Sequence, residues 1–401
     1  MRIVLITSGQ PTLNPRLIKE ADALFQEGYQ VTVIYQYWND WATIQDVDLL
    51  AEKKWKAIRI GGSPREHKLI YWYSKLRFKL GSFLFQHFRT ASELAIGRCS
   101  ELLYQEAKKH PADLYIAHNL AALPAAIKAA KIAKAKAGFD AEDFHRNEVT
   151  DDENNSDVIL KKQIEERYMP QADYLTAASE LISQKYRVIL NKEVTTILNV
   201  FPKKEITEKP LKNNFLKLFW FSQTIGPNRG LEEVIQSLNK IKKPFQLHLL
   251  GNITPSYYED LLKMVTFTKE NLSILEPVHP DNIFEIANAF DIGLATECAY
   301  PLNRDICLTN KIFTYMQSGL AIIASDTSAQ RKFMDQYPAM GFVYQNTAIK
   351  TLEEVILIYI NNPDLLKLHK SNAKSYATNS LNWETEKIKF LSVVKQVIKA
   401  G

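Results

Sequence analysis

The segment Phe219–Arg229 reads FWFSQTIGPNR, and the nine residues that follow read GLEEVIQSL. The first residues are apolar and β-prone, and a helical pattern begins at Gly230. We therefore expect a strand that ends at the turn of Ser, Gly and Pro residues and a helix that follows directly. This strand–turn–helix unit is the element from which parallel sheets are built.

The turn at this junction also predicts an anion site. Unpaired backbone N–H groups and the positive end of a helix dipole point at such a turn, and Arg229 adds a charge that can bind two phosphate oxygens. Gly226 and its neighbour Asn228 are expected to contribute backbone donors, and Gly251, near the end of the next apolar run, is assigned to the same site. The alternative is a glycine turn that serves only close packing.

The same unit occurs at the start of the chain, where residues 1–37 read as strand, loop, helix and strand. The apolar runs are short and rich in Val and Ile, with little polar alternation, which is typical of strands buried on both faces of a parallel sheet. Similar runs continue through both halves: LYIAHNL (114–120), KAGFDAEDF (136–144), ADYLTAASE (172–180), FQLHLLGN (245–252), LSILEPVHP (272–280), FDIGLATE (290–297) and LAIIASD (320–326). The pattern predicts an α/β chain with two doubly wound, Rossmann-like domains.

Composition agrees with two ordinary globular domains. A chain of 401 residues exceeds what one core usually serves, and its 46% hydrophobic residues are typical of a soluble protein. We find no apolar run that would span a bilayer and no export signal at the amino terminus. The three cysteines, Cys99, Cys298 and Cys307, lack zinc spacing. Free thiols in a reducing cytoplasm are therefore the expectation.

We expect a first domain at 1–200, a linker at 201–214 and a second domain at 215–381. The linker, FPKKEITEKPLKNN, is rich in Lys and Pro and has no apolar periodicity. Residues 382–401 form an amphipathic helix with Trp383 and Phe390 on its apolar side. It could pack on either half, and crossing back to complete the first domain is one arrangement.

Four motifs occur in an order that resembles a known group. They are NPRLIKEADALFQEGYQVTVI (14–34), LYIAHNLAALPAAIKAAK (114–131), SQTIGPNRGLEEVI (222–235) and TNKIFTYMQSGLAIIASD (309–326). Over nearly the whole chain the sequence resembles the two-domain glycosyltransferases of the GT-B fold, and it is most similar to glycosyltransferase family 4.

The resemblance implies transfer of a sugar from a nucleotide diphosphate donor to a glycan or lipid-linked acceptor, usually with retention of configuration. It also implies two domains that face each other across a cleft, with the donor mainly on the second and the acceptor mainly on the first. Surface polysaccharide or glycolipid biosynthesis is the expected setting, and no cofactor is expected besides the donor. Arg229 and Lys311, each at a helix start, are expected to stabilise the leaving diphosphate.

In the first half, Gly9 and Gln10 follow the first strand and are expected to offer backbone donors. This chain has SGQPTLNP where the family often has a Gly-rich loop. Asn14 and Arg16 could supply side-chain contacts instead, although Arg16 could equally pair with Glu20 one helical turn later.

His118 ends the strand LYIAH, and the matching His of the family lies against the donor sugar. The alternative is a packed or capping histidine. His145 is a second candidate, near the acceptor, among the acidic residues Asp140, Glu142 and Asp143. These acidic residues could equally form a polar cap for the next helix.

The family has two glutamates in the second half, one facing the sugar and one binding the ribose. Glu297 is the first choice for the former and Asp305 the second choice. Thr314 occupies the position of the latter, so the ribose carboxylate is missing, and Asn310 begins the same helix. A shifted donor preference or a loss of catalysis would both agree with this change.

No metal site is expected. The pair Asp46 and Asp48 is the only Asp-x-Asp, and its polar surroundings indicate a solvated loop. Arg229 and Lys311 could provide the charge that Mg²⁺ would otherwise supply.

The segment 53–89 combines Lys and Arg with Trp, Tyr, Phe and Leu and has almost no acidic residues. Such a helix can lie on an anionic membrane, so the protein could be peripheral on the inner face of a membrane. The alternative places the aromatic rings in the core of the first domain. No motif for reading nucleic acid accompanies the charge, and we expect no nucleic acid partner.

Three functions stay open at this point. A glycosyltransferase is first, a sugar-nucleotide epimerase of the same architecture is second, and a relative that binds nucleotide sugars with little or no catalysis is third. Donor, acceptor and linkage depend on pocket contacts that one sequence does not define.

Overall fold

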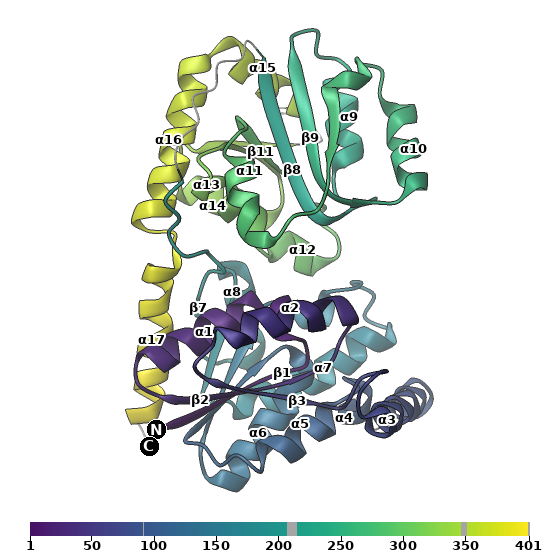
Figure 1. The fold of residues 1–401 in the computed structure, drawn as a ribbon, viewed down its shortest axis with the longest axis vertical. Coiled ribbons are helices and arrows are strands. Elements are labelled where there is room, and N and C mark those ends of the chain that lie inside the picture. Colours follow the sequence, from purple (N-terminus) through teal and green to yellow (C-terminus); the bar gives the residue numbers. More distant parts are fainter. Residues whose placement is uncertain (91, 207–214, 346–350, 400–401) are drawn as a thin grey trace. The chain divides into compact units, whose positions relative to one another are not determined.

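The computed structural model describes residues 1–90, 92–206, 215–345 and 351–399. The chain forms two compact units (Figure 1). The first unit contains Met1–Leu198 and the chain from Lys387 onward, and the second contains Asn199–Glu386.

The first unit is built on a parallel sheet of seven strands in the order β3-β2-β1-β4-β5-β6-β7. Its central strands are buried on both faces, as the uninterrupted apolar runs predict. The chain winds outward from β1 in one direction and from β4 in the other, so these two strands form the topological switch point. The strands are β1 Arg2–Thr7, β2 Gln30–Gln36, β3 Lys56–Ile60, β4 Leu114–His118, β5 Lys136–Ala141, β6 Tyr174–Ala177 and β7 Thr195–Thr196.

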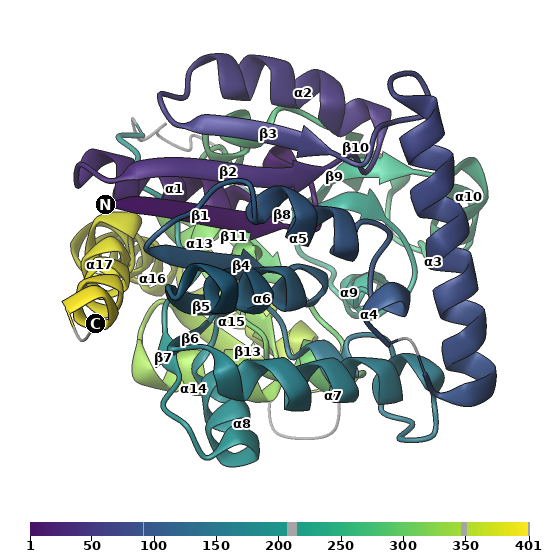
Figure 2. The ribbon, with the colours of Figure 1, turned by 90° about the horizontal axis from the view of Figure 1, so that it is seen from below.

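Helices cover both faces of this sheet: α1 lies on one face and α5 and α6 lie on the other (Figure 1). The helix α3 runs along one edge of the unit (Figure 2). The helices are α1 Pro15–Gln26, α2 Asp40–Ala51, α3 Lys68–Phe88, α4 Ser92–Ala95, α5 Ser100–Ala107, α6 Leu123–Ala133, α7 Ser156–Tyr168 and α8 Glu180–Leu190, with short 3-10 helices at Pro11–Leu13, Leu120–Ala122, His145–Asn147 and Met169–Gln171.

The second unit has a parallel sheet of six strands in the order β10-β9-β8-β11-β12-β13. Here the switch point lies between β8 and β11. Both sheets are doubly wound, so the predicted fold class is confirmed. The strands are β8 Leu216–Ile225, β9 Phe245–Ile253, β10 Leu272–Leu275, β11 Ile292–Ala295, β12 Ala321–Ser325 and β13 Gly341–Tyr344.

The core of the second unit forms where the apolar faces of its helices meet this sheet. Trp220, Leu247 and Ile323 of three strands are fully buried together with Leu231 and Val355 of the covering helices. The helices are α9 Leu231–Leu238, α10 Pro255–Met264, α11 Ile283–Ala287, α12 Leu302–Ile306, α13 Asn310–Gln317, α14 Ser328–Gln336, α15 Leu352–Asn361 and α16 Pro363–Asn379, with 3-10 helices at Lys269–Asn271 and Pro280–Asn282.

One strand end differs from the sequence prediction. We expected the strand to end at the Ser of FWFSQTIGP, but β8 continues to Ile225. The register with β9 shifts between Phe221, which lies opposite Leu250, and Thr224, which lies opposite Asn252. A bulge of this kind lets a strand continue through residues that do not alternate regularly.

The segment predicted as a linker, 201–214, is only partly described. Residues 201–206 belong to the second unit and are held there by the bond from Trp383 N to Phe201 O and by the ion pair of Lys204 with Asp281. Residues 207–214 lie outside the described residues.

The carboxyl-terminal helix α17, Trp383–Lys399, contains the boundary between the units, because the first unit resumes at Lys387. Phe390 of this helix is fully buried, and Lys395 Nζ lies 2.5 Å from Oε2 of Glu27, the residue that follows α1. Residues 387–399 therefore group with the first unit.

None of the helices in the described part of the chain is both long enough and apolar enough to cross a membrane. Cys99, Cys298 and Cys307 are free thiols.

Candidate functional site

The loop between β8 and α9 lies at the switch point of the second sheet, where the carboxyl ends of β8 and β11 are neighbours. Gly230 precedes α9 with a φ of 75°, and a Cβ atom there would lie 2.8 Å from Cβ of Thr296. A Cβ at Gly226 would meet Thr224 Cγ2 at an ordinary 3.9 Å. The glycine that this turn requires is therefore Gly230.

Arg229 is half-buried in this loop and is fixed at both its side chain and its backbone. Its Nη1 donates to Ser222 Oγ at 3.0 Å, and its carbonyl accepts from Thr296 Oγ1 at 2.8 Å. Thr296 in turn accepts from Nε1 of the buried Trp220 at 3.0 Å. The loop is thus tied to the end of β11 through one threonine.

Lys311 is the second residue of α13 and forms an ion pair with the carboxylate of Glu297. Only 9% of its side chain is exposed, and its Nζ lies 5.2 Å from the centre of the Trp220 ring. Trp220 therefore touches Lys311 with its ring and the Arg229 loop through Thr296. The two predicted cations belong to one connected site at the carboxyl edge of the second sheet.

Glu297, the predicted sugar-facing carboxylate, is the second residue after β11. Its backbone N–H donates to Ser325 Oγ at 2.8 Å, which ties it to the end of β12. Asp305, the second choice, accepts instead from the backbone and hydroxyl of Ser328 at 2.8 and 2.6 Å. Asp305 thus caps the start of α14, and Glu297 is the carboxylate beside Lys311.

The remaining predicted residues of this unit have clear local roles. Asn228 is exposed with a φ of 59°, and its carbonyl accepts from Arg304 Nη1 at 3.0 Å. Gly251 lets β9 approach the bulge of β8, because a Cβ there would lie 2.2 Å from Ser222 O. Thr314 is buried, and its hydroxyl donates to the carbonyl of Asn310 at 3.1 Å. The hydroxyl of Thr314 is therefore used inside its own helix.

In the first unit, the predicted residues Gly9 and Gln10 follow β1. The Gly9 N–H donates to Thr7 Oγ1 at 3.1 Å. Gln10 is fully buried, and its Oε1 accepts from the backbone of Trp38 and Asn39 at 2.8 Å each. The side chain of Gln10 joins the first loop to the start of α2 and is not directed at a ligand.

The expectation of a solvated loop around Asp46 is wrong. Asp46 lies on α2 with 4% exposed surface and accepts from Gln10 Nε2 at 2.7 Å and from Thr12 N at 2.8 Å. A buried carboxylate that receives several bonds is a structural anchor. The polar composition of the segment around Asp46 gave no sign of this role, because the groups that donate to Asp46 belong to the first loop.

His118 ends β4 and is fully buried among acidic side chains. Its Nε2 lies 3.1 Å from Glu20 Oε2, and its Nδ1 lies 3.4 Å from Glu142 Oε1 and 3.6 Å from Asp140 Oδ2. Burial opposes the charged ring, but the carboxylates outweigh burial and raise the pKa of His118 to about 10. Its predicted contact with a sugar stays a prediction, and the burial favours a positioning role.

The same cluster contains Arg16, whose side chain is 1% exposed. Its guanidinium binds Asp140 through two nitrogens, with Nη2 to Oδ1 at 2.7 Å, and its Nε lies 3.7 Å from Glu20 Oε1. The pairing with Glu20 considered from the sequence is therefore present, and Asp140, which was not expected as a partner, is the closer of the two carboxylates. Asn14 caps α1 through Leu17 N at 2.9 Å and donates to Glu142 at 2.7 Å.

Glu20, His118 and Asp140 place ligand atoms within 4.8 Å of one another, which would suit a metal ion by spacing. Arg16 and a protonated His118 already supply positive charge to these carboxylates. The cluster therefore fits a buried ion-pair network better than a metal centre.

His145 lies in a 3-10 helix, and its Nδ1 is 2.6 Å from Glu148 Oε1. Burial opposes its charge, but Glu148 outweighs burial and raises the pKa of His145 to about 9. Glu148 also pairs with Lys161 at 2.6 Å. Two of the acidic residues expected around His145 have other partners, since Asp140 binds Arg16 and Glu142 binds Asn14. The carboxylate bound to His145 is that of Glu148.

Sequence reasoning missed Trp220, Thr296 and Ser325, which hold the second-unit site together. Thr296 and Ser325 each stand at the end of an apolar run, and this polar residue at a strand end was the available signal. Trp220 gave no such signal, because a Trp within an apolar strand is usually only core.

No family model matches the sequence, and no curated protein matches it significantly. Solved structures do match over the full chain. A glycosyltransferase from Rickettsia africae ESF-5 has a TM-score of 0.72 at 14% identity, and the match covers 100% of this chain and 99% of that chain.

HepE from Anabaena, solved in complex with UDP, has a TM-score of 0.71 at 15% identity and is matched over 99% of this chain and 100% of its own. Sucrose-phosphate synthase from Thermosynechococcus elongatus has a TM-score of 0.69 at 12% identity, with 100% of both chains covered. At such identities the likeness shows a shared fold. The expected GT-B fold is confirmed.

Proposed function

We propose that the protein transfers a sugar from a nucleotide diphosphate sugar to a glycan or lipid-linked acceptor, in the biosynthesis of a surface polysaccharide or glycolipid. The observation that carries this proposal is the connected site of Arg229, Thr296, Trp220, Lys311 and Glu297 at the carboxyl edge of the second sheet. It combines two fixed cations with the amino end of α9 in the place where open parallel sheets bind ligands.

The chemistry needs charge stabilisation at the leaving group. When the bond between sugar and diphosphate breaks, negative charge builds up on the diphosphate oxygens. Arg229 and Lys311 can stabilise this charge at no cost of reorganisation, because Ser222 and Glu297 already hold them in place. Glu297 keeps Lys311 in the site and offers a carboxylate that can accept a hydrogen bond from a sugar hydroxyl.

Two finer features belong to the same proposal: retention of anomeric configuration and independence of metal. The two cations support metal independence, since they supply the charge that Mg²⁺ would otherwise provide. Full turnover in excess chelator is expected, and a complete loss restored by Mg²⁺ would contradict this feature. The anomeric configuration of the product, read by NMR, tests retention.

A uridine nucleotide is the first donor to try, because HepE, which shares the fold, has been solved with UDP and with UDP-glucose. The test follows nucleotide diphosphate release from a panel of nucleotide sugars, with and without membrane extract. Release that depends on the extract supports transfer to an acceptor.

The variants Lys311→Met and Arg229→Ala should each lower turnover by at least about 100-fold, a loss expected when a cation at the developing charge is removed. Lys240→Ala is the matched control, because Lys240 is exposed and lies after the far end of α9. Near-normal turnover in both site variants would reject the proposal.

A catalytically weak relative that still binds nucleotide sugars is the second candidate, and Thr314 favours it. The hydroxyl of Thr314 is bonded inside α13, so this position offers no carboxylate to a ribose. Such a protein would bind UDP in calorimetry without releasing it from any donor. A sugar-nucleotide epimerase would instead return an altered nucleotide sugar without any acceptor.

A further inference from the structure

Helix α3, Lys68–Phe88, directs a row of large apolar side chains to solvent. Its members recur every three or four residues, and at about 100° per residue they fall within an arc of about 80°. We call this row the α3 stripe. Its members and their exposed fractions are Leu69 87%, Trp72 58%, Leu76 68%, Leu80 54% and Phe83 51%.

The opposite side of α3 is firmly packed, so the stripe is not exposed by fraying. Ser74, Gly81 and Phe85 are buried on this side. A Cβ at Gly81 would lie 2.6 Å from Cβ of Leu94, so α4 crosses α3 in close contact. From the sequence, the aromatic residues of this helix could either contact a membrane or enter the core of the first domain. The aromatic residues of the stripe lie outside the core.

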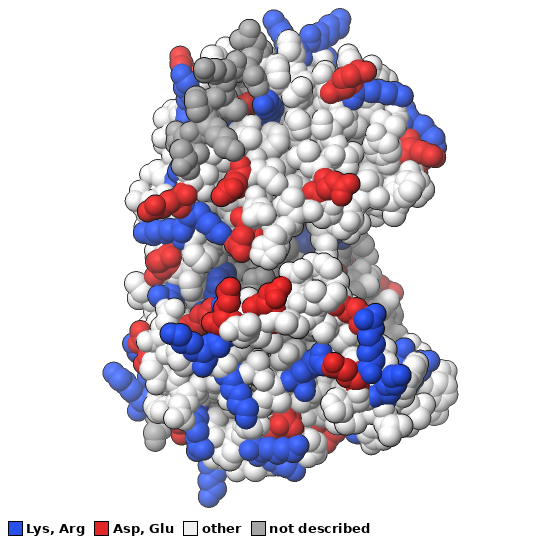
Figure 3. Space-filling view, viewed as in Figure 1, with Lys and Arg blue, Asp and Glu red and all other residues white. Residues whose placement is uncertain are grey.

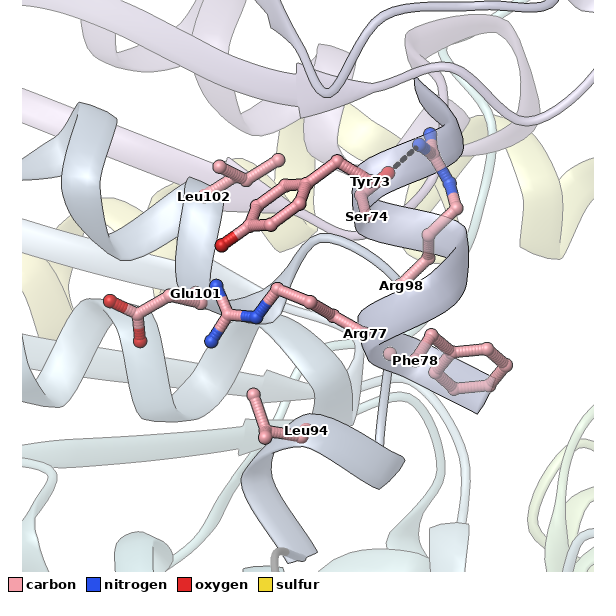
Figure 4. Close-up of a pocket in the computed structure, with 9 residues that line it drawn as sticks. Tyr73, Ser74, Arg77, Phe78, Leu94, Arg98, Glu101 and Leu102 are labelled. Atoms are coloured by element: carbon pink, nitrogen blue, oxygen red, sulfur yellow. Dashed lines mark hydrogen bonds between the residues drawn. The ribbon is translucent and has the colours of Figure 1, made fainter. Parts of the chain in front are cut away.

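Arg98 fixes the rotation of α3 about its own axis. Its Nη1 donates to Ser74 Oγ at 2.7 Å and to Gly61 O at 2.8 Å. Figure 4 shows Arg98 reaching Ser74, while Tyr73 and Arg77 point toward Glu101 and Leu102 of α5. The packing therefore determines which residues face solvent.

Three lysines flank the α3 stripe, and the helix contains no Asp or Glu. On the helical projection Lys68, Lys75 and Lys79 lie on one side of the stripe. Arg77 lies on the other side and points toward Glu101 of α5 (Figure 4). Lys75 Nζ lies 5.0 Å from the centre of the Trp72 ring. The surface of the first unit around α3 shows uncharged side chains with Lys and Arg beside them (Figure 3).

We propose that the α3 stripe docks the protein on an anionic lipid bilayer. The helix lies in the plane of the surface, with its apolar side chains among the headgroups and its cations on lipid phosphates. With 21 residues and four cations, α3 is interfacial and does not cross the bilayer. The aromatic members suit this zone, where rings with an apolar body are enriched.

Charge distinguishes a lipid surface from a second copy of the chain. Two α3 stripes in contact would bring the three flanking lysines of one copy near those of the other, with no acidic residue of either helix between them. Such like-charge contacts oppose association. An anionic bilayer instead gains both from the apolar area and from each cation, about 1 kcal/mol per Lys or Arg near the surface.

The test is co-sedimentation of the full chain with vesicles of phosphatidylcholine, with and without phosphatidylglycerol. Binding is expected only with phosphatidylglycerol, and it should weaken when salt rises from about 0.1 M to 0.5 M. The variant Lys68→Gln/Lys79→Gln should bind about 30-fold more weakly, which corresponds to about 1 kcal/mol for each cation.

Leu69→Ser/Leu76→Ser/Leu80→Ser should weaken vesicle binding by more than about tenfold. The matched control is Ile132→Ser/Val188→Ser, since both are exposed apolar residues of α6 and α8 in the same unit. Circular dichroism and thermal melting verify that each variant is folded. The measurement does not depend on catalysis and can be made without any nucleotide sugar.

Equal sedimentation of the α3 variant and the control variant would overturn the proposal, as would equal binding to both kinds of vesicle. Concentration-dependent dimers in analytical ultracentrifugation that disappear only in the α3 variant would assign the stripe to self-association and would also overturn it.

Discussion

The Lys311 ammonium and the Glu297 carboxylate form an ion pair in which only 9% and 11% of the side chains are exposed. The ring of Trp220 lies 5.2 Å from Lys311 Nζ, so the pair is set against an aromatic wall. Removing one partner of such a buried pair is costly, because the other charge stays buried without a counter-charge. An anionic ligand could then replace the missing partner.

The variant Glu297→Gln is therefore expected to lower the free energy of unfolding by about 3 kcal/mol in the absence of nucleotide. UDP should raise the melting temperature of this variant more than that of the wild type, because the diphosphate supplies the missing negative charge. Differential scanning fluorimetry with and without UDP measures both effects. Glu353→Gln, which breaks the exposed pair with Lys240, is the control. If UDP raised the melting temperature of the variant and of the wild type by the same amount, Lys311 would not belong to the nucleotide site.

His118 should make stability depend on pH. Burial opposes its charge, but Glu20 on α1, with Glu142 and Asp140, outweighs burial, and the pKa of His118 rises to about 10. In the unfolded chain the pKa of His is about 6.5. The folded state binds the proton more tightly, so the stabilisation is complete below pH of about 6.5 and is lost as pH rises through about 10.

Urea unfolding of the wild type and of His118→Gln, at several pH values between about 6 and 10, tests this expectation. The stability advantage of the wild type should shrink as pH rises. Two other groups also titrate in this range: Lys19, because burial and Arg16 lower its pKa to about 7, and His145. Both titrate in the wild type and in the variant, so their contributions cancel in the difference between the two proteins. An advantage that stays constant over this range would exclude a charged imidazole.

The β8–α9 loop allows a matched pair of glycine substitutions. Gly230→Ala places a Cβ 2.8 Å from Thr296 at a φ of 75°, so it should cost about 1–3 kcal/mol of stability and displace Arg229. Gly226→Ala meets no contact closer than 3.9 Å, so its melting temperature should stay near that of the wild type. The melting temperature and the UDP affinity of both variants test which glycine the loop requires. A larger loss at Gly226 would reverse the assignment of the essential glycine.

Most strands were predictable because they are short, continuous apolar runs, which are typical of strands buried on both faces of a parallel sheet. The strands β3, β7 and β13 at the edges of the two sheets were not predicted, and β3 and β7 are not such runs. The end of β8 was not predictable in the same way. The polar residues Ser222, Gln223 and Thr224 are typical of a turn. Only the pairing of Thr224 and Ile225 with β9, beyond a bulge, extends the strand to Ile225. Neighbouring strands therefore decide boundaries that local composition leaves open.

The candidate site likewise has some features with a local sequence signal and others that depend on tertiary contacts. Arg229 and Lys311 were chosen from the sequence because each stands at a helix start, which is a local signal, and matches a basic position of the family that the sequence resembles. Their connection through Trp220 and Thr296 is a tertiary contact and leaves no local pattern. The burial of His118 was hidden for the same reason, since its partners Glu20 and Asp140 come from other elements of the fold.

Helix α17 offers a direct test of the carboxyl terminus as part of the first unit. Phe390 is fully buried, so Phe390→Ala should lower the free energy of unfolding by about 3–5 kcal/mol through lost burial and a new cavity. Ile388 lies two residues earlier and is 68% exposed, so Ile388→Ala should change stability by less than about 0.5 kcal/mol. Hydrogen exchange should show the Phe390→Ala loss in α1 as well, because Lys395 of α17 pairs with Glu27 next to that helix. Protection lost only in the second unit would place the end of the chain there instead.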